Sequence, residues 1–243
     1  MFPSKADLLD TRICDLRLRL RSSLFVPAIR ALNAELKRAG IRLRPRHYLS
    51  TGYGCVVRSV DVGLLFTDGF PELRPIARAI GMRVRTPIQF LYTLRHEAGH
   101  AFCYAHRLYA TKSFRELFGV HGSFYNTYPA RWRPSQADRS RVARGEIVRV
   151  YAARHADEDF ATCFQTWLEA PVACMERYRR RPRIAEKLAY VAAVVRLYGP
   201  RPAAHGSAPA DDDVDVLRVT LRQWLTRVRR AQDYNLFPRG PVA

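Results

Sequence analysis

The sequence of 243 residues predicts an α+β protein in which helices dominate and a small sheet lies beside one long helix. Apolar residues recur at helical spacing over most of the chain, whereas only two short stretches suit strands. Hydrophobic residues make up 48% of the chain, which excludes a disordered or collagen-like protein. A chain of this length and composition can bury one well-formed core.

The first part of the chain predicts two helices followed by strands. Apolar residues at helical spacing predict one helix over residues 8–20 and a second over 25–36, which ends near Gly40. Residues 41–50 look extended. Residues 60–66 place apolar side chains at every second position, as in a half-buried strand, before an Asp-Gly turn.

The remainder is mostly helical. A short helix is expected after Pro71 and a long one over 87–108, and residues 157–180 and 183–198 again have helical spacing. Residues 119–140 are rich in Gly, Pro and Ser but also carry aromatic side chains, which favours an ordered loop over a flexible linker.

We divide the chain into a domain of residues 1–200, a linker of residues 201–213, and a C-terminal basic amphipathic helix with its tail, residues 214–243. The linker contains Gly, Pro, Ala and Ser in a stretch without apolar periodicity. The final helix has arginines on one face, and the other face carries Leu217, Leu221, Trp224 and Val228.

The chain is strongly basic, with 41 Lys and Arg residues against 22 Asp and Glu residues and a formal net charge of +19. Such a surface attracts nucleic acid or acidic proteins weakly and non-specifically. We predict no specific nucleic-acid partner, because the arginines are spread out and no recognised nucleic-acid motif is present. No apolar run reaches the ~20 residues of a membrane helix, and the N-terminus lacks the apolar core of a secretory signal, so a cytoplasmic protein is expected.

The stretch "TLRHEAGHAFCYAH", residues 93–106, contains the motif HExxH. On a helix with ~100° per residue, His100 lies ~40° from His96, so both rings point the same way and can share one metal ion. Glu97 lies between the histidine face and the apolar face. From there it could take a proton from a zinc-activated water, which is the chemistry that HExxH supports.

A catalytic zinc requires a third protein ligand, and the spacing leaves several candidates. His106 would lie ~9 Å further along the same helix and turned away, since a helix rises ~1.5 Å per residue. Cys103 shares the stripe of the two histidines, but three ligands on one straight helix span too far to converge. His155 could contribute from a loop. Glu158 and Asp159, at the start of the next helix, are not separated by spacing, and acidic residues there also suit the helix dipole.

Four blocks of sequence carry a resemblance to known proteins. "LRHEAGHAFCYAHRL", "FRELFG", "YAARHADEDFATCFQTWL" and "EKLAYVAAVV" resemble, in order and approximate spacing, a family of bacterial zinc-binding metallopeptidases. The resemblance runs from about residue 13 to about residue 198. It implies that residues 1–200 form a zincin-like domain of gluzincin type, in which two histidines and a glutamate hold the zinc. The second long block is also similar to the catalytic tail of anthrax lethal factor, where a tyrosine lies seven residues before the ligand glutamate.

The resemblance assigns roles to particular residues. It implies that His96, His100 and Glu158 are the Zn²⁺ ligands, and it thereby separates Glu158 from Asp159. It implies that Glu97 is the general base and that the Tyr151 hydroxyl stabilises the oxyanion of the tetrahedral intermediate.

The implied function is a zinc-dependent metallopeptidase that hydrolyses a peptide or protein substrate. By the same analogy, the strand around 60–66 lines the cleft and pairs with an extended peptide.

The chain departs from the family pattern in two places. Thr162 stands where the family pattern EDFAE has its second glutamate, a residue that could orient a histidine ligand. The chain also lacks the N-terminal zinc ribbon of some relatives. Thr162 and the positive charge support an alternative function, a catalytically decayed or structural zinc-binding protein that binds nucleic acid or acidic partners. Tyr125 and Tyr128 are expected to pack within their loop.

Overall fold

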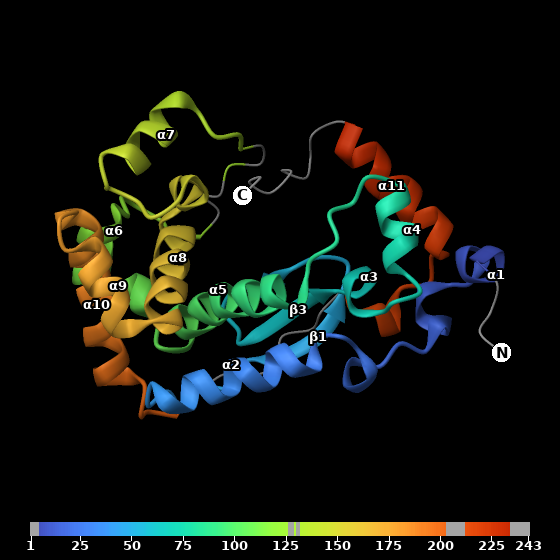
Figure 1. The fold of residues 1–243 in the computed structure, drawn as a ribbon, viewed down its shortest axis with the longest axis horizontal. Coiled ribbons are helices and arrows are strands. Elements are labelled where there is room, and N and C mark those ends of the chain that lie inside the picture. The colour runs from blue at the N-terminus through green and yellow to red at the C-terminus, as the bar shows by residue number, and fades with distance from the viewer. Residues whose placement is uncertain (1–4, 126–128, 130–131, 203–211, 234–243) are drawn as a thin grey trace.

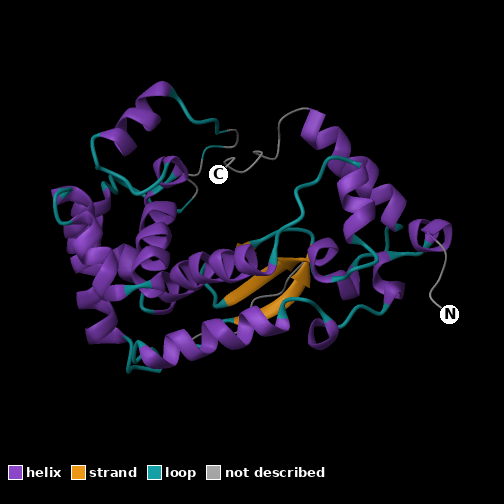
Figure 2. Ribbon diagram, viewed as in Figure 1, coloured by secondary structure: helices purple, strands orange, loops and turns teal. Residues whose placement is uncertain are grey.

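The computed structural model describes residues 5–125, 129, 132–202 and 212–233. Over these residues helices dominate and surround a small sheet (Figure 2), as expected for an α+β protein. None of the described helices combines the length and the apolar character that a membrane crossing requires.

The sheet has three strands in the order β1-β3-β2, with bounds β1 (Arg46–Ser50), β2 (Gly54–Cys55) and β3 (Asp61–Leu65). β1 runs parallel to β3 along all five residues, and β2 pairs antiparallel with β3 at Val62 and Gly63. Every residue of β3 is buried, as expected for a central strand. β3 thus has strand partners on both sides at Val62 and Gly63, which leaves these two residues no free edge for the extended peptide that the resemblance implies.

Four long helices build the core beside the sheet (Figure 1): α2 (Val26–Arg38), α5 (Pro87–Ala105), α8 (Ala156–Glu169) and α10 (Pro182–Tyr198). α5 packs against β2 and β3, against α2 along one side and most extensively against α8. α10 in turn covers α8. The apolar stripes expected on α5 and α8 are buried, and they include Leu94, Ala98, Ala101, Phe102, Phe160, Phe164, Trp167 and Leu168.

The remaining elements are short, except for the C-terminal helix α11, which is as long as α2. They are α1 (Lys5–Asp10), η1 (Ile13–Leu16), η2 (Leu20–Ser22), α3 (Phe66–Gly69), α4 (Arg74–Ala79), η3 (Leu108–Ala110), α6 (Lys112–Phe118), α7 (Gln136–Ala143), η4 (Val150–Arg154), α9 (Pro171–Tyr178), η5 (Val214–Val216) and α11 (Leu221–Asp233), where η denotes a 3₁₀ helix.

Four predicted elements differ from the structure. The Asp-Gly turn expected after the strand is instead the end of the helix α3. The single helix expected over residues 8–20 is instead α1 followed by two 3₁₀ turns. The helix expected over 157–180 breaks at Ala170, because Pro171 begins α9 at its first turn and lacks the N–H needed to continue α8. α7 begins inside the predicted loop, where Ser135 and Asp138 cap it reciprocally.

The C-terminal helix α11 packs against the N-terminal part of the chain, away from α9 and α10 (Figure 1). Its apolar face is buried, and the Trp224 ring lies 4.8 Å from that of Phe66. On its polar side, Arg222 forms an ion pair with Asp10 at 2.8 Å. The linker predicted over 201–213 falls largely on residues 203–211, which lie outside the described residues.

Candidate metal centre

Helix α5 presents the two histidines from a rigid, buried element. Thr86 and Gln89 form a capping box at its start, and Pro87 occupies the first turn, where a missing N–H costs nothing. His96 and His100 lie one turn apart, with ring centroids separated by 4.8 Å. His100 is 6% exposed, so its ring is buried and does not lie on an open helix face.

Helix α8 brings a carboxylate to the same point because it packs closely against α5. The Glu158 Oε2 atom lies 2.9 Å from His96 Nε2 and 3.3 Å from His100 Nε2. The two histidine Nε2 atoms are 3.2 Å apart. Among the described residues, this is the group of three potential ligands whose donor atoms converge on one point.

The geometry of the three atoms fits a tetrahedral zinc ion. With bonds of about 2.0–2.1 Å, two ligand atoms of a tetrahedral zinc lie about 3.3 Å apart. The observed separations of 2.9, 3.2 and 3.3 Å are close to that value. Two imidazole nitrogens and one carboxylate oxygen are ligands that zinc accepts, and three protein ligands leave a fourth position for water. The residues present therefore fit a catalytic zinc.

A second carboxylate, that of Asp157, lies on the other side of the His100 ring. Its Oδ1 atom lies 2.9 Å from His100 Nδ1, and its Oδ2 atom accepts a hydrogen bond from the Tyr104 hydroxyl. Metal-binding histidines usually donate their other ring N–H to such a group, which fixes the tautomer and orientation of the ring. Sequence reasoning missed Asp157, although its place directly before Glu158 in the first turn of α8 was a usable signal.

The charges in this cluster favour a cation. Burial lowers the pKa of His100, but the Asp157 and Glu158 carboxylates outweigh burial and raise it well above its ordinary value. Burial raises the pKa of Glu158, whereas hydrogen bonds from His100 and His96 reverse this and hold it far below its usual range. The carboxylates are therefore ionised, and positive charge between the ligands is stabilised.

Glu97 is buried, with 7% of its surface exposed, on the side of α5 that packs against β2. The thiol of Cys55 in β2 has a pKa raised well above its ordinary value, first by burial and next by the nearby negative charge of Glu97. Glu97 thus lies directly after His96 on a different helix face and is absent from the group of converging atoms.

Tyr151 lies on the 3₁₀ turn η4 and contacts the cluster through Glu158. Its hydroxyl donates a hydrogen bond to Glu158 Oε1 at 2.9 Å and accepts one from Arg154 Nη1 at 2.8 Å. The indole of Trp132 packs edge-on against the phenol ring, with centroids 6.0 Å apart. Tyr151, which the resemblance singled out, is therefore next to the triad. Its hydroxyl contacts the Glu158 carboxylate, and its second partner, Arg154, was not predicted.

The other candidate ligands have different partners. The His106 ring packs on Phe102 at the end of α5, and Cys103 is a buried thiol whose pKa is raised, first by burial. The His155 ring packs against an aromatic side chain, and its Nδ1 atom accepts a hydrogen bond from the Asp157 backbone N–H at 3.1 Å as the N-cap of α8.

Asp159, next to Glu158 in sequence, points away from the triad. It forms a buried ion pair with Lys187 of α10, with 2.6 Å between Oδ2 and Nζ. Lys187 also donates to the Glu146 backbone carbonyl at 2.8 Å. The two consecutive carboxylates of α8 thus serve different parts of the molecule.

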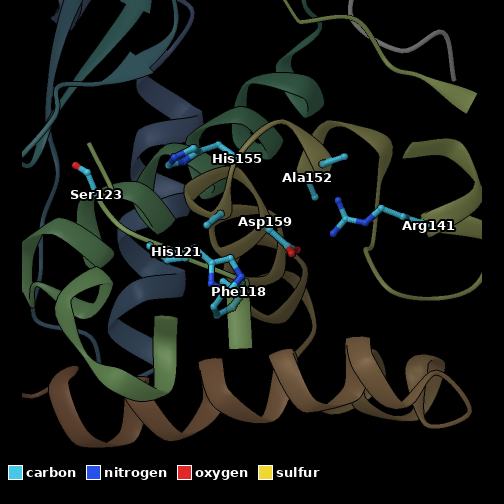
Figure 3. A pocket seen from close by; sticks show the side chains of 11 residues that line it. Phe118, His121, Ser123, Arg141, Ala152, His155 and Asp159 are labelled. Carbon is cyan, nitrogen blue, oxygen red and sulfur yellow. The ribbon is translucent and has the colours of Figure 1, made fainter. Parts of the chain in front are cut away.

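A cavity of about 330 Å³ lies on this second side of α8 (Figure 3). Asp159, His155 and Arg141 are among its lining residues, and Figure 3 shows the Arg141 and Asp159 side chains directed toward one another. His96, His100 and Glu158 do not line it. The cavity is therefore separate from the triad.

Three further residues were singled out from the sequence. Thr162, the departure from the family pattern, is buried one turn after Glu158 on α8. Because Asp157 already lies beside His100 Nδ1, an orienting carboxylate is present despite the threonine. Tyr125 packs edge-on against Tyr109, with centroids 5.0 Å apart, whereas Tyr128 lies outside the described residues.

Comparison of the chain with protein families, with curated proteins and with solved structures found no match.

Proposed function

We propose that the protein is a zinc-dependent peptidase with a zincin-like fold of gluzincin type. The observation that carries the proposal is the convergence of His96 Nε2, His100 Nε2 and Glu158 Oε2, with separations of 2.9 to 3.3 Å, beside a buried glutamate that follows the first histidine. A long HExxH helix next to a small sheet, with the third ligand on a following helix, supports the same class.

When bound, zinc supplies a Lewis acid that polarises a carbonyl and lowers the pKa of a water to about 7. The other parts of the reaction fall to side chains of this chain. Glu97 accepts the proton of the attacking water and later gives a proton to the leaving amine. Asp157 keeps the His100 ring in the orientation that directs its Nε2 atom toward the other ligands.

The Tyr151 hydroxyl supplies the hydrogen bond to the oxyanion that develops on the substrate carbonyl. At rest it donates to Glu158 Oε1, the carboxylate oxygen that is not nearest the histidines. Redirecting this donor exchanges one charge-assisted hydrogen bond, to the ionised Glu158 carboxylate, for another to the oxyanion, so the hydroxyl can stabilise the oxyanion without a net loss of hydrogen bonds.

An extended substrate would lie against β2 and not β3, since β2 is the strand of the sheet that packs on α5 with one side unpaired among the described residues. The strand is only two residues long, Gly54–Cys55. It would therefore contribute a small number of backbone hydrogen bonds next to the Glu97 side of the cluster.

The test is cleavage of a diverse peptide library by the zinc-loaded protein, with and without a chelator. Cleavage should require zinc and should fall by at least about 100-fold in Glu97→Gln, because general-base catalysis contributes about 10²–10⁴-fold. Glu176→Gln is the matched control, since that carboxylate is 72% exposed on α9 and far from the ligands in sequence. Full zinc occupancy without any cleavage would refute the peptidase and favour a structural zinc protein.

A further inference from the structure

Arg154 lies beside Tyr151 and Glu158, two residues of the proposed active site. It is the last residue of η4 and lies three positions after Tyr151. In a 3₁₀ helix with three residues per turn, side chains at positions i and i+3 eclipse each other. The turn therefore stacks the guanidinium directly beside the phenol, and both side chains reach the first turn of α8.

We infer that Arg154 is a positioning residue that fixes the direction in which the Tyr151 hydroxyl donates its proton. The inference rests on the proposed function, because it assigns a purpose to Tyr151 in that reaction. It goes beyond the resemblance, which assigns nothing to Arg154.

The contacts identify the hydroxyl as the nearer partner of the guanidinium. Arg154 Nη1 lies 2.8 Å from the Tyr151 oxygen but 3.7 Å from Glu158 Oε1. The Tyr151 hydroxyl fills the intervening position, 2.9 Å from the same carboxylate oxygen. The order of groups is thus guanidinium, hydroxyl, carboxylate. The Arg154 side chain is 29% exposed, so it borders the cluster from the solvent side.

Hydrogen-bond chemistry then sets the direction. A guanidinium carries donors and no acceptor, and it stays protonated in proteins. It therefore occupies a lone pair of the Tyr151 oxygen and leaves the single hydroxyl proton to point away from Arg154. That proton goes to Glu158 Oε1 at rest and to the substrate oxyanion during reaction. A donor that itself accepts a charged hydrogen bond is also polarised and becomes stronger.

The phenol remains a neutral donor in this setting. A phenol has an ordinary pKa of about 10, so its hydroxyl is protonated at neutral pH. Arg154 therefore acts through the strength and direction of the donor and leaves the proton on the tyrosine.

The experiment is a double-mutant cycle on the zinc-loaded protein with acetohydroxamate as the probe, because its oxygens mimic the oxyanion and need no known substrate. Binding is measured by calorimetry for wild type, Arg154→Ala, Tyr151→Phe and the double variant. We expect about tenfold weaker binding for Arg154→Ala and at least that loss for Tyr151→Phe, since oxyanion donors have effects of this order or larger. The double variant should bind no more weakly than Tyr151→Phe alone. Additive losses would overturn the inference.

Zinc affinity and a conservative variant separate positioning from a purely structural role. Zinc affinity should stay within about threefold of wild type in Arg154→Ala, because the ligands keep their places; a large loss would mean that Arg154 holds Glu158 and would overturn the inference. Arg154→Lys should recover part of the hydroxamate binding, as it restores a cationic donor. Arg144→Ala, on an arginine that pairs with Glu146 at 2.5 Å, is the matched control and should change nothing.

Once a cleaved peptide is known, Arg154→Ala should lower kcat with little change in KM. A change confined to KM would contradict the inference. A wild type that binds zinc and hydroxamate but cleaves no peptide refutes the proposed function, while the cycle still decides the coupling of Arg154 to Tyr151. A wild type that binds no zinc overturns both.

Discussion

Gly99, the glycine of HEAGH, lies where α5 crosses α8, and replacing it with alanine tests the contact that assembles the site. A Cβ atom there would lie 2.9 Å from Ala161 Cα, 3.2 Å from the Ala161 carbonyl oxygen and 3.1 Å from Phe164 Cβ. Two of these atoms belong to the α8 backbone and cannot rotate away. The substitution must therefore push the two helices apart.

The expected magnitude combines two opposing effects. In an unhindered helix, replacing Gly by Ala stabilises by about 1 kcal/mol. Overpacking a tight core contact costs about 1–3 kcal/mol, so we expect a net loss of up to about 2 kcal/mol in the free energy of unfolding. Ordinary contact requires 3.4–4 Å, so α8 must retreat by several tenths of an ångström. Because metal–ligand distances tolerate only about 0.2 Å, zinc affinity should fall by about tenfold or more.

The assay is urea unfolding of the zinc-free protein together with zinc affinity measured by chelator competition. Gly119→Ala is the control, because Gly119 has a φ of +70° with no atom near its absent Cβ. That variant should lose about 1 kcal/mol through backbone strain but keep its zinc affinity. A Gly99→Ala protein that is more stable than wild type and binds zinc equally well would refute the packing described here.

Three more predictions concern buried titratable groups. Asp157→Asn should weaken zinc binding by about 10–100-fold in chelator competition, since it disturbs the partner of His100 Nδ1, and unchanged affinity would contradict that role. Asp159→Asn should cost about 3–5 kcal/mol in urea unfolding because it leaves the Lys187 ammonium buried without its carboxylate, yet each chain should still bind zinc; a loss of less than 1 kcal/mol would argue against the ion pair. Burial lowers the pKa of His47 from 6.5 to about 4. Its neutral ring therefore stabilises the fold fully above pH 6.5, and a contribution of up to about 3 kcal/mol is lost as the pH falls from 6.5 through 4. His47→Gln should flatten the dependence of the unfolding free energy on pH in that window, and an unchanged slope would show that His47 does not titrate in this way.

Local periodicity was enough to predict the helices that carry the site. The apolar stripes of α5 and α8 repeat every three to four residues, and burial of such a stripe depends on the helix itself more than on its partner. The same reasoning failed at the N-terminus. Residues with helical spacing there form α1, η1 and η2; α1 packs against α11 and η1 against η5, both near the C-terminal end of the described chain. Contacts more than 200 residues away in sequence outweigh a weak local preference.

The candidate site likewise depends partly on local spacing and partly on contacts between residues distant in sequence. His96 and His100 follow from spacing on one helix, but the choice between Glu158 and Asp159 depends on Lys187, which lies 28 residues further along the chain. The central place of β3 in the sheet could not be predicted, because strand order is set by pairing and not by the residues of one strand. Asp157 and Arg154 acquire their roles only when α8 and η4 meet α5.

The measurement that tests the central claim most directly is zinc content by elemental analysis, on wild type, Glu158→Ala and Asp159→Asn side by side. The account predicts one zinc per chain in wild type and Asp159→Asn, and its loss in Glu158→Ala. Zinc retained in Glu158→Ala would contradict the His96–His100–Glu158 centre, and a wild type without zinc would reduce HEAGH to a coincidence of sequence.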